Sequence, residues 1–152
     1  MELDAVIDRP DAAPVEAVEA VEVLPLRISE DVVRVRQAVR TAAVRASFSL
    51  VDQTKLVTAA SELARNTIDY GRGGECRLEH LRDGERLGVR LTFADRGPGI
   101  PDIEAALRDG YTTGGGLGMG LGGSRRLVEE FAIESAPGEG TTVRIARWTW
   151  RR

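Results

Sequence analysis

Hydrophobic positions recur every three to four residues in two long stretches of the first half of the chain. Before the first stretch stands Ser29, which predicts a helix that this residue caps and that runs to about Ser47. A second helix is predicted from about Asp52 to Tyr70, where a glycine-rich turn ends it. The segment 22–28 alternates well enough to predict a strand. The apolar stripe of the first helix is Val32, Val35, Val39 and Ala43, and the core-facing arc of the second is Leu56, Ala60, Leu63, Thr67 and Tyr70.

The second half of the chain alternates between strand-like and helix-like patterns. Two strand-like segments, 75–82 and 86–93, are joined across Asp83 and Gly84, which is typical of a β-hairpin. Antiparallel hairpins that alternate with helices favour a two-layer α/β sandwich, in which a mixed, mostly antiparallel sheet carries its helices on one face. The predicted strands are 75–82, 86–93, 132–135 and 141–150, and the predicted helices are 101–108 and 121–131.

The N-terminal segment differs in composition from the rest. Residues 1–22 contain seven acidic side chains against Arg9 alone, and Pro10 and Pro14 interrupt any regular element. This pattern predicts a disordered acidic tail over residues 1–21. One domain over residues 22–152 is expected to follow it.

Composition and charge narrow the class of protein. With 152 residues, of which 42% are hydrophobic and 30% charged, the chain is typical of one globular domain. The single cysteine and the single histidine, Cys76 and His80, can form neither a disulfide nor a zinc site, and we interpret them as packing residues. Since no long apolar segment or basic leader is present, we expect a cytoplasmic protein without membrane contact. Nucleic acid is not expected as a partner, because the chain has no dense basic stripe with aromatic residues.

The second predicted helix carries the first candidate for chemistry. Its residues Glu62, Asn66 and Asp69 are spaced so that they follow one edge of the helix, beside the core-facing arc. The amide oxygen of Asn66 is a suitable ligand for Mg²⁺, and Glu62 could orient or deprotonate a nucleophile. The alternative is an ordinary solvated face of an amphipathic helix.

A second candidate follows the apolar segment 89–93, at the end of the predicted strand 86–93. Asp95 comes at the end of that strand, and Gly97 and Gly99 come directly after it. Glycine lets a ligand approach the backbone closely, and the carboxylate of Asp95 could accept a hydrogen bond from an exocyclic amine such as that of adenine. The alternative is a simple turn.

The third candidate is a glycine-rich segment before the helix predicted from 121. Residues 110–123 contain eight of the 17 glycines, and backbone N–H groups in such a segment can bind phosphates. The spacing of Gly118, Gly120 and Gly123 fits the dinucleotide pattern, but no strand precedes it as that motif requires, and no P-loop lysine follows. We therefore interpret the segment as a phosphate-binding lid; a plain linker is the alternative.

Taken together and in this order, the three motifs resemble the GHKL superfamily of ATP-binding domains, to which gyrase, Hsp90 and histidine kinases belong. Within that superfamily the chain resembles the anti-sigma-factor branch, and most of all the switch serine/threonine kinases of bacterial stressosomes. The resemblance covers about residues 22–150. It rests on the segments SELARN (61–66), DRGPGIPDI (95–103), DGYTTGGGLGMGL (109–121) and GEGTT (138–142).

The resemblance implies a role for each matching residue. Glu62 would be the general base and Asn66 the Mg²⁺ ligand, while Asp95 would hold the adenine amine. Gly97 and Gly99 would shape the pocket, and Thr141 would support the adenine. The implied nucleotide-binding residues of the lid are Gly114, Gly115, Gly116, Leu117, Gly118, Met119, Gly120 and Leu121.

The resemblance also implies an activity and partners. It indicates an ATP- and Mg²⁺-dependent serine/threonine protein kinase that phosphorylates STAS-domain antagonist or scaffold proteins and can activate a PP2C-type phosphatase. One alternative is an ATP-binding anti-sigma factor that sequesters a sigma factor. Another is a nucleotide-sensing adaptor that transfers no phosphoryl group.

Overall fold

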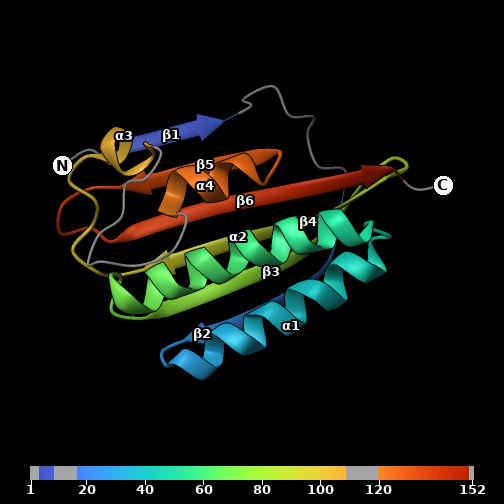
Figure 1. Ribbon diagram of the computed structural model, residues 1–152, viewed down its shortest axis with the longest axis horizontal. Coiled ribbons are helices and arrows are strands. Elements are labelled where there is room, and N and C mark those ends of the chain that lie inside the picture. Colours follow the sequence, from blue (N-terminus) through green and yellow to red (C-terminus); the bar gives the residue numbers. More distant parts are fainter. Residues whose placement is uncertain (1–3, 9–16, 109–119, 151–152) are drawn as a thin grey trace.

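The computed structural model describes residues 4–8, 17–108 and 120–150. Figure 1 shows a single sheet with the helices α1, α2 and α4 on one of its faces. The elements in chain order are β1 (Asp4–Asp8), β2 (Ala17–Leu26), α1 (Ser29–Arg45), α2 (Leu50–Asp69), β3 (Gly74–Asp83), β4 (Arg86–Asp95), α3 (Ile103–Ala106), α4 (Gly120–Arg126), β5 (Glu130–Ser135) and β6 (Thr141–Trp150).

The sheet has six strands in the order β1-β5-β6-β4-β3-β2. Each pair of neighbouring strands in the described part of the chain is antiparallel. The predicted two-layer α/β sandwich with helices on one face is thus confirmed. The central strands β4 and β6 pair from Arg86 with Trp150 to Asp95 with Thr141, so the two ends of this ladder bring distant parts of the sequence together.

The core lies between the sheet and the helices. All four residues of the stripe predicted for α1 are buried, as are Leu56, Ala60, Leu63 and Thr67 of α2. Tyr70 differs from the prediction, because 41% of its surface is exposed. Its backbone is still in the αR region, but it is the C-cap at the very end of α2, where less of the protein covers the helix than along its length.

The N-terminal segment differs from the predicted disordered tail. Within residues 1–21, Asp4–Asp8 form β1, which pairs with β5, and β2 begins at Ala17 and pairs with β3. Both strands are edge strands, and most of β2 is exposed. An edge strand is held by backbone hydrogen bonds on one side, so an acidic composition that could not fill a core is still compatible with it.

The helix ends differ from the predictions in detail. Ser29 is the first residue of α1 and not its cap, because the N-cap is Ile28. The carboxylate of Asp31, in the first turn, accepts hydrogen bonds from the backbone N–H groups of Arg27 and Ile28 at 2.8 and 3.1 Å. Ser49 caps α2 through a bond from the N–H of Asp52. No helix in the described part of the chain is long and apolar enough to span a membrane.

The helices after β4 are shorter than predicted. The helix predicted over 101–108 has only its central turn, Ile103–Ala106. The helix predicted to reach Phe131 ends at Arg126, because the chain joins the sheet at Glu130, where backbone pairing with β6 begins.

Candidate functional site

A cavity of about 440 Å³ opens between α2, the end of β4 and the start of α4. Its walls come from five separate parts of the sequence, which the fold brings to one end of the sheet. The lining residues are Glu62, Leu63, Asn66, Thr67, Asp69, Tyr70, Gly71, Arg72, Phe93, Asp95, Pro98, Gly99, Ile100, Pro101, Ala106, Gly120, Leu121, Thr141 and Val143.

Most of the predicted site residues that the structure describes meet in this cavity. These are Glu62, Asn66, Asp95, Gly99, Gly120, Leu121 and Thr141. Gly97 is not part of the lining, but its backbone N–H donates a hydrogen bond to Oδ1 of Asp95, which is. The predicted lid residues Gly114, Gly115, Gly116, Leu117, Gly118 and Met119 lie outside the described residues.

The polar edge of α2 borders the cavity along its length. Glu62, Asn66 and Asp69 all line it, and the side chain of Glu62 is only 13% exposed. The guanidinium of Arg65 lies 3.8 Å from Oε1 of Glu62. A fully solvated helix face would leave these carboxylates in open water, so the burial of Glu62 favours the interpretation of a site.

Asp95 is held rigidly at the end of β4. Its Oδ1 accepts hydrogen bonds from the backbone N–H groups of Gly97 at 2.9 Å and of Thr141 at 3.1 Å. Burial raises the pKa of the Asp95 carboxyl above its ordinary value, although these two hydrogen bonds oppose the rise. Because Oδ1 holds both backbone donors, Oδ2 is the oxygen with capacity for a ligand.

Two glycines allow the end of α2 to pack directly on Asp95. A Cβ atom on Gly71 would lie 2.3 Å from Cγ and Oδ2 of Asp95, and one on Gly97 would lie 2.7 Å from Cα of Gly71. Sequence reasoning assigned Gly71 only to a helix-ending turn, and missed its contact with the site. Its position one residue after Tyr70, at the end of the polar edge of α2, is the signal that could have indicated it.

Ser135 is a second residue that sequence reasoning missed. Its buried hydroxyl accepts a hydrogen bond from the N–H of Ile100 at 2.8 Å and donates to the carbonyl of Gly140 at 2.9 Å. The Oγ1 of Thr141 lies 2.9 Å from the same hydroxyl. Ser135 therefore fixes the loop after β4 against the turn before β6, and so shapes one wall of the cavity.

The oxygen atoms in the cavity suit a metal ion that is coordinated jointly by the protein and a bound ligand, and not one coordinated by the protein alone. In the described part of the chain no three His, Cys, Asp or Glu side chains gather into a metal site. The cavity offers the amide oxygen of Asn66 beside the carboxylates of Glu62 and Asp69. Mg²⁺ keeps several waters and is often bound by one or two protein oxygens together with phosphates, so Asn66 fits such an ion.

Cys76 has no part in the site. It is fully buried in β3, and burial, with smaller contributions from Glu22 and Glu75, raises the pKa of its thiol to about 12. A thiol of this kind stays protonated and unreactive at neutral pH. The interpretation of Cys76 as a packing residue is therefore confirmed.

Comparison with known proteins places this geometry in a family. Residues 51–150 match the model of the histidine kinase-, DNA gyrase B- and HSP90-like ATPases. The chain is 43% identical over 118 residues to the serine/threonine-protein kinase RsbT of Bacillus subtilis strain 168, which covers 78% of this chain and 89% of that protein. It is 32% identical over 97 residues to the anti-sigma F factor of Thermoanaerobacter strain X514, covering 60% of this chain and 66% of that protein.

The fold is shared with a solved structure. A crystal structure of RsbU and RsbW domains from Mycobacterium tuberculosis aligns with a TM-score of 0.58 at 20% identity, over 88% of this chain and 34% of that chain. The family match covers all of the described cavity residues, and a domain of this family binds ATP. The chain therefore belongs to the family of histidine kinase-, DNA gyrase B- and HSP90-like ATPases, and within it is an RsbT-like serine/threonine protein kinase.

Proposed function

We propose that the cavity binds Mg·ATP and that the protein phosphorylates a serine or threonine of a STAS-domain antagonist or scaffold protein in a sigma-factor-regulating, partner-switching module. The observation that carries this proposal is the meeting of Glu62, Asn66 and Asp95 around one cavity of about 440 Å³. The similarity to RsbT supports it independently. Binding and activation of a PP2C-type phosphatase, in a cytoplasmic module, completes the proposed role.

The recognition end of the cavity is built around Asp95. Oδ2 of Asp95 would accept a hydrogen bond from the adenine amine, while Oδ1 stays bound to the N–H groups of Gly97 and Thr141. Gly99 and Thr141 line the same end of the cavity, where Thr141 would support the base. The preorganised carboxylate needs no rearrangement when adenine binds, which favours affinity.

The reactive end of the cavity is the polar edge of α2. Asn66 would ligate the Mg²⁺ that neutralises the phosphates, and Gly120 and Leu121 at the start of α4 lie where backbone groups can contact them. The oxygen of the substrate hydroxyl forms a bond to the γ-phosphorus as the bond to the ADP oxygen breaks. Glu62 accepts the hydroxyl proton, and the phosphoprotein and ADP leave. The predicted lid residues 114–119 would complete the phosphate site.

The test is phosphoryl transfer from labelled ATP to STAS proteins encoded in the same genome. Glu62→Gln should bind Mg·ATP and the partner normally but transfer phosphoryl at least roughly 10²-fold more slowly, because the amide cannot accept the proton. Asn66→Ala should also lose the metal dependence of ATP binding. Arg77→Gln, on the opposite face of the sheet, serves as the control and should transfer normally. Normal transfer by Glu62→Gln would remove Glu62 from the mechanism.

ATP binding by itself can be measured by thermal denaturation. At an ATP concentration one hundred times its dissociation constant, Mg·ATP should raise the free energy of unfolding by about 2.7 kcal/mol. GTP and NADH should raise it less. An equal shift with NADH would contradict the assignment of the cavity to ATP.

The second candidate function is ATP-dependent sequestration of a sigma factor. The similarity to an anti-sigma F factor favours it, since that protein shares 32% identity over most of the domain. Affinity capture with the purified protein separates the two functions. Retention of a sigma factor in place of a STAS protein would support the second function and contradict the first.

A further inference from the structure

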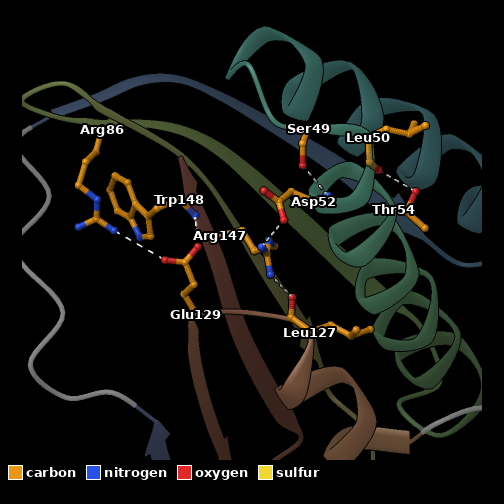
Figure 2. Close-up of polar contacts among 9 residues, drawn as sticks. All are labelled: Ser49, Leu50, Asp52, Thr54, Arg86, Leu127, Glu129, Arg147 and Trp148. Carbon is orange, nitrogen blue, oxygen red and sulfur yellow. Dashed lines mark hydrogen bonds and ion pairs between the residues drawn. The ribbon is translucent and has the colours of Figure 1, made fainter. Parts of the chain in front are cut away.

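A partly buried arginine connects the two helices that form opposite walls of the cavity. Arg147 lies on β6, and Figure 2 shows its guanidinium reaching between α2 and the end of α4. Its Nη2 donates to Oδ1 of Asp52 at 2.6 Å, and its Nη1 donates to the backbone carbonyl of Leu127 at 2.7 Å. Asp52 belongs to the first turn of α2, and Leu127 directly follows α4.

The contacts of Arg147 suit the electrostatics of both helix ends. The first turn of a helix favours a negative charge and the last turn a positive one, so Asp52 and Arg147 each stand where the helix dipole favours them. Leu127 also donates its N–H to the carbonyl of Ser124, which continues the last turn of α4. Arg147 therefore holds the end of α4 against the beginning of α2.

The contacts of Arg147 are not well suited to a role in stability alone. Its side chain is 13% exposed, and its Nε is the buried side-chain atom that has no hydrogen-bond partner among the described residues. A partly buried ion pair with an unsatisfied donor contributes little net stability, and an apolar pair of similar volume is often as stable or more so. The pairing of Arg147 with Asp52 therefore points to a requirement on the relative position of α2 and α4.

The relative position of α2 and α4 affects the cavity, which lies at the ends of the two helices that are away from Arg147. Along α2, Glu62 and Asn66 lie about 15 and 21 Å from Asp52, by the rise of an α-helix. Gly120 and Leu121 are the first two residues of α4 and line the opposite wall. The link between Asp52 and Leu127 therefore joins the two helices at the ends away from the cavity.

The segment after α4 is already fixed to the sheet by other contacts. The backbone N–H of Trp148 donates to Oε1 of Glu129 at 2.9 Å, and the N–H of Glu129 donates to the carbonyl of Ala146 at 3.1 Å. Arg86 lies 3.8 Å from Oε2 of Glu129 and stacks over the ring of Trp148 (Figure 2). These contacts hold the segment on β6, whereas Arg147 connects it to α2.

We propose that Arg147 is a positioning residue for nucleotide binding: through Asp52 and Leu127 it sets the spacing of α2 and α4, and so the width of the cavity between them. The inference rests on the proposed binding of ATP in this cavity. Gly120 and Leu121 contact the nucleotide before and during transfer alike, so a change in their position alters the affinity for ATP and leaves turnover nearly unchanged.

The test compares Arg147→Met with Arg90→Met. Arg90 makes two hydrogen bonds to the buried Glu79 on the opposite face of the sheet, at 2.9 and 3.1 Å, so the two form a matched, partly buried ion pair remote from the cavity. Arg147→Met should raise the Kd and the KM for ATP about tenfold, with kcat within twofold of the unchanged protein. Arg90→Met should lower the melting temperature without changing either constant for ATP.

Two further variants keep the test decisive if Arg147→Met fails to fold. Arg147→Lys retains the charge but cannot make both hydrogen bonds from one rigid plane, so it should raise the Kd for ATP by a smaller factor. The double variant Asp52→Leu with Arg147→Met removes the charged pair together, and should fold with a melting temperature near that of the unchanged protein while still binding ATP weakly.

An unchanged Kd for ATP in the folded Arg147 variants would overturn the inference and make Arg147 a purely structural residue. A rise in Kd of the same size in Arg90→Met would overturn it as well, since the effect would then follow from lost stability. The unchanged protein is titrated first, and its failure to bind ATP would contradict the proposed function itself.

Discussion

Replacement of Asp95 by asparagine keeps one oxygen of this carboxyl group and replaces the other by an NH₂ group, so it tests the roles of the two oxygens separately. The retained Oδ1 of asparagine can still accept the N–H groups of Gly97 and Thr141, which lie 2.9 and 3.1 Å from Oδ1 of Asp95. These bonds fix the orientation of the amide, so its NH₂ group takes the place of Oδ2. We therefore expect the fold to be preserved while the acceptor for the adenine amine becomes a donor.

The magnitude follows from the loss of one buried hydrogen bond. An unpaired buried donor costs about 1–3 kcal/mol, which corresponds to a rise in the Kd for ATP of about 5- to 160-fold. The melting temperature should stay equal or rise slightly. Burial disfavours the charged carboxylate of Asp95, as the direction of its pKa indicates, and the neutral amide of asparagine avoids that penalty.

The exchange of acceptor for donor also predicts a change in base preference. Guanine carries a carbonyl oxygen where adenine carries its amine, so the NH₂ group of Asp95→Asn can donate to it. Isothermal titration with ATP and GTP should therefore show the preference for ATP reduced or reversed. Unchanged affinity for ATP together with an unchanged melting temperature would refute the reasoning and place adenine recognition elsewhere.

Three more predictions concern packing and titration. Gly71→Ala should lower the free energy of unfolding by about 1–3 kcal/mol and weaken ATP binding, because its Cβ would lie 2.3 Å from Asp95; denaturant titration and calorimetry measure the two effects. Hydrogen bonds from Arg90 hold the pKa of Glu79 below its ordinary value of 4.5, so ionised Glu79 contributes stability above that pH and loses it as the pH falls below. Glu79→Gln should accordingly flatten the acid side of a plot of stability against pH, and an unaltered slope would contradict this. Cys76 should react with a thiol reagent at neutral pH only after unfolding, and rapid labelling of the native protein would contradict the burial of its thiol.

The parts of the site that sequence predicts well depend on local periodicity. Glu62 and Asn66 lie on a helix whose apolar stripe is unambiguous, so their position beside the core follows from the helical repeat alone. Asp95 ends a strand of strongly apolar character, and a strand end beside glycines is a recognisable place for a ligand. Both predictions need only neighbouring residues, and the structure brings these side chains to one cavity.

The parts that sequence does not predict depend on contacts between distant residues. Ser135 binds the N–H of Ile100 across 35 positions, and Arg147 reaches Asp52 across 95. No local pattern specifies such a pair, because neither member of it is distinctive in its own part of the sequence. The strand predicted over 22–28 overlaps β2, but β1 and the first part of β2 are unpredicted for a related reason: composition measures how much a segment can bury, and an edge strand is held by its backbone.

The turn at the end of α2 contacts both ends of the cavity, the reactive end at Asn66 and the recognition end at Asp95. The carbonyl of Asn66 accepts hydrogen bonds from the N–H groups of both Tyr70 and Gly71 at 3.0 Å, so the turn that ends the helix is tied to the residue proposed to bind Mg²⁺. Gly71 in turn packs on Asp95, the residue proposed to bind adenine. A shift of this turn therefore moves both groups at once. The beginning of the same helix is capped by Ser49 and connected to the end of α4 by Arg147, so α2 is fixed at both ends.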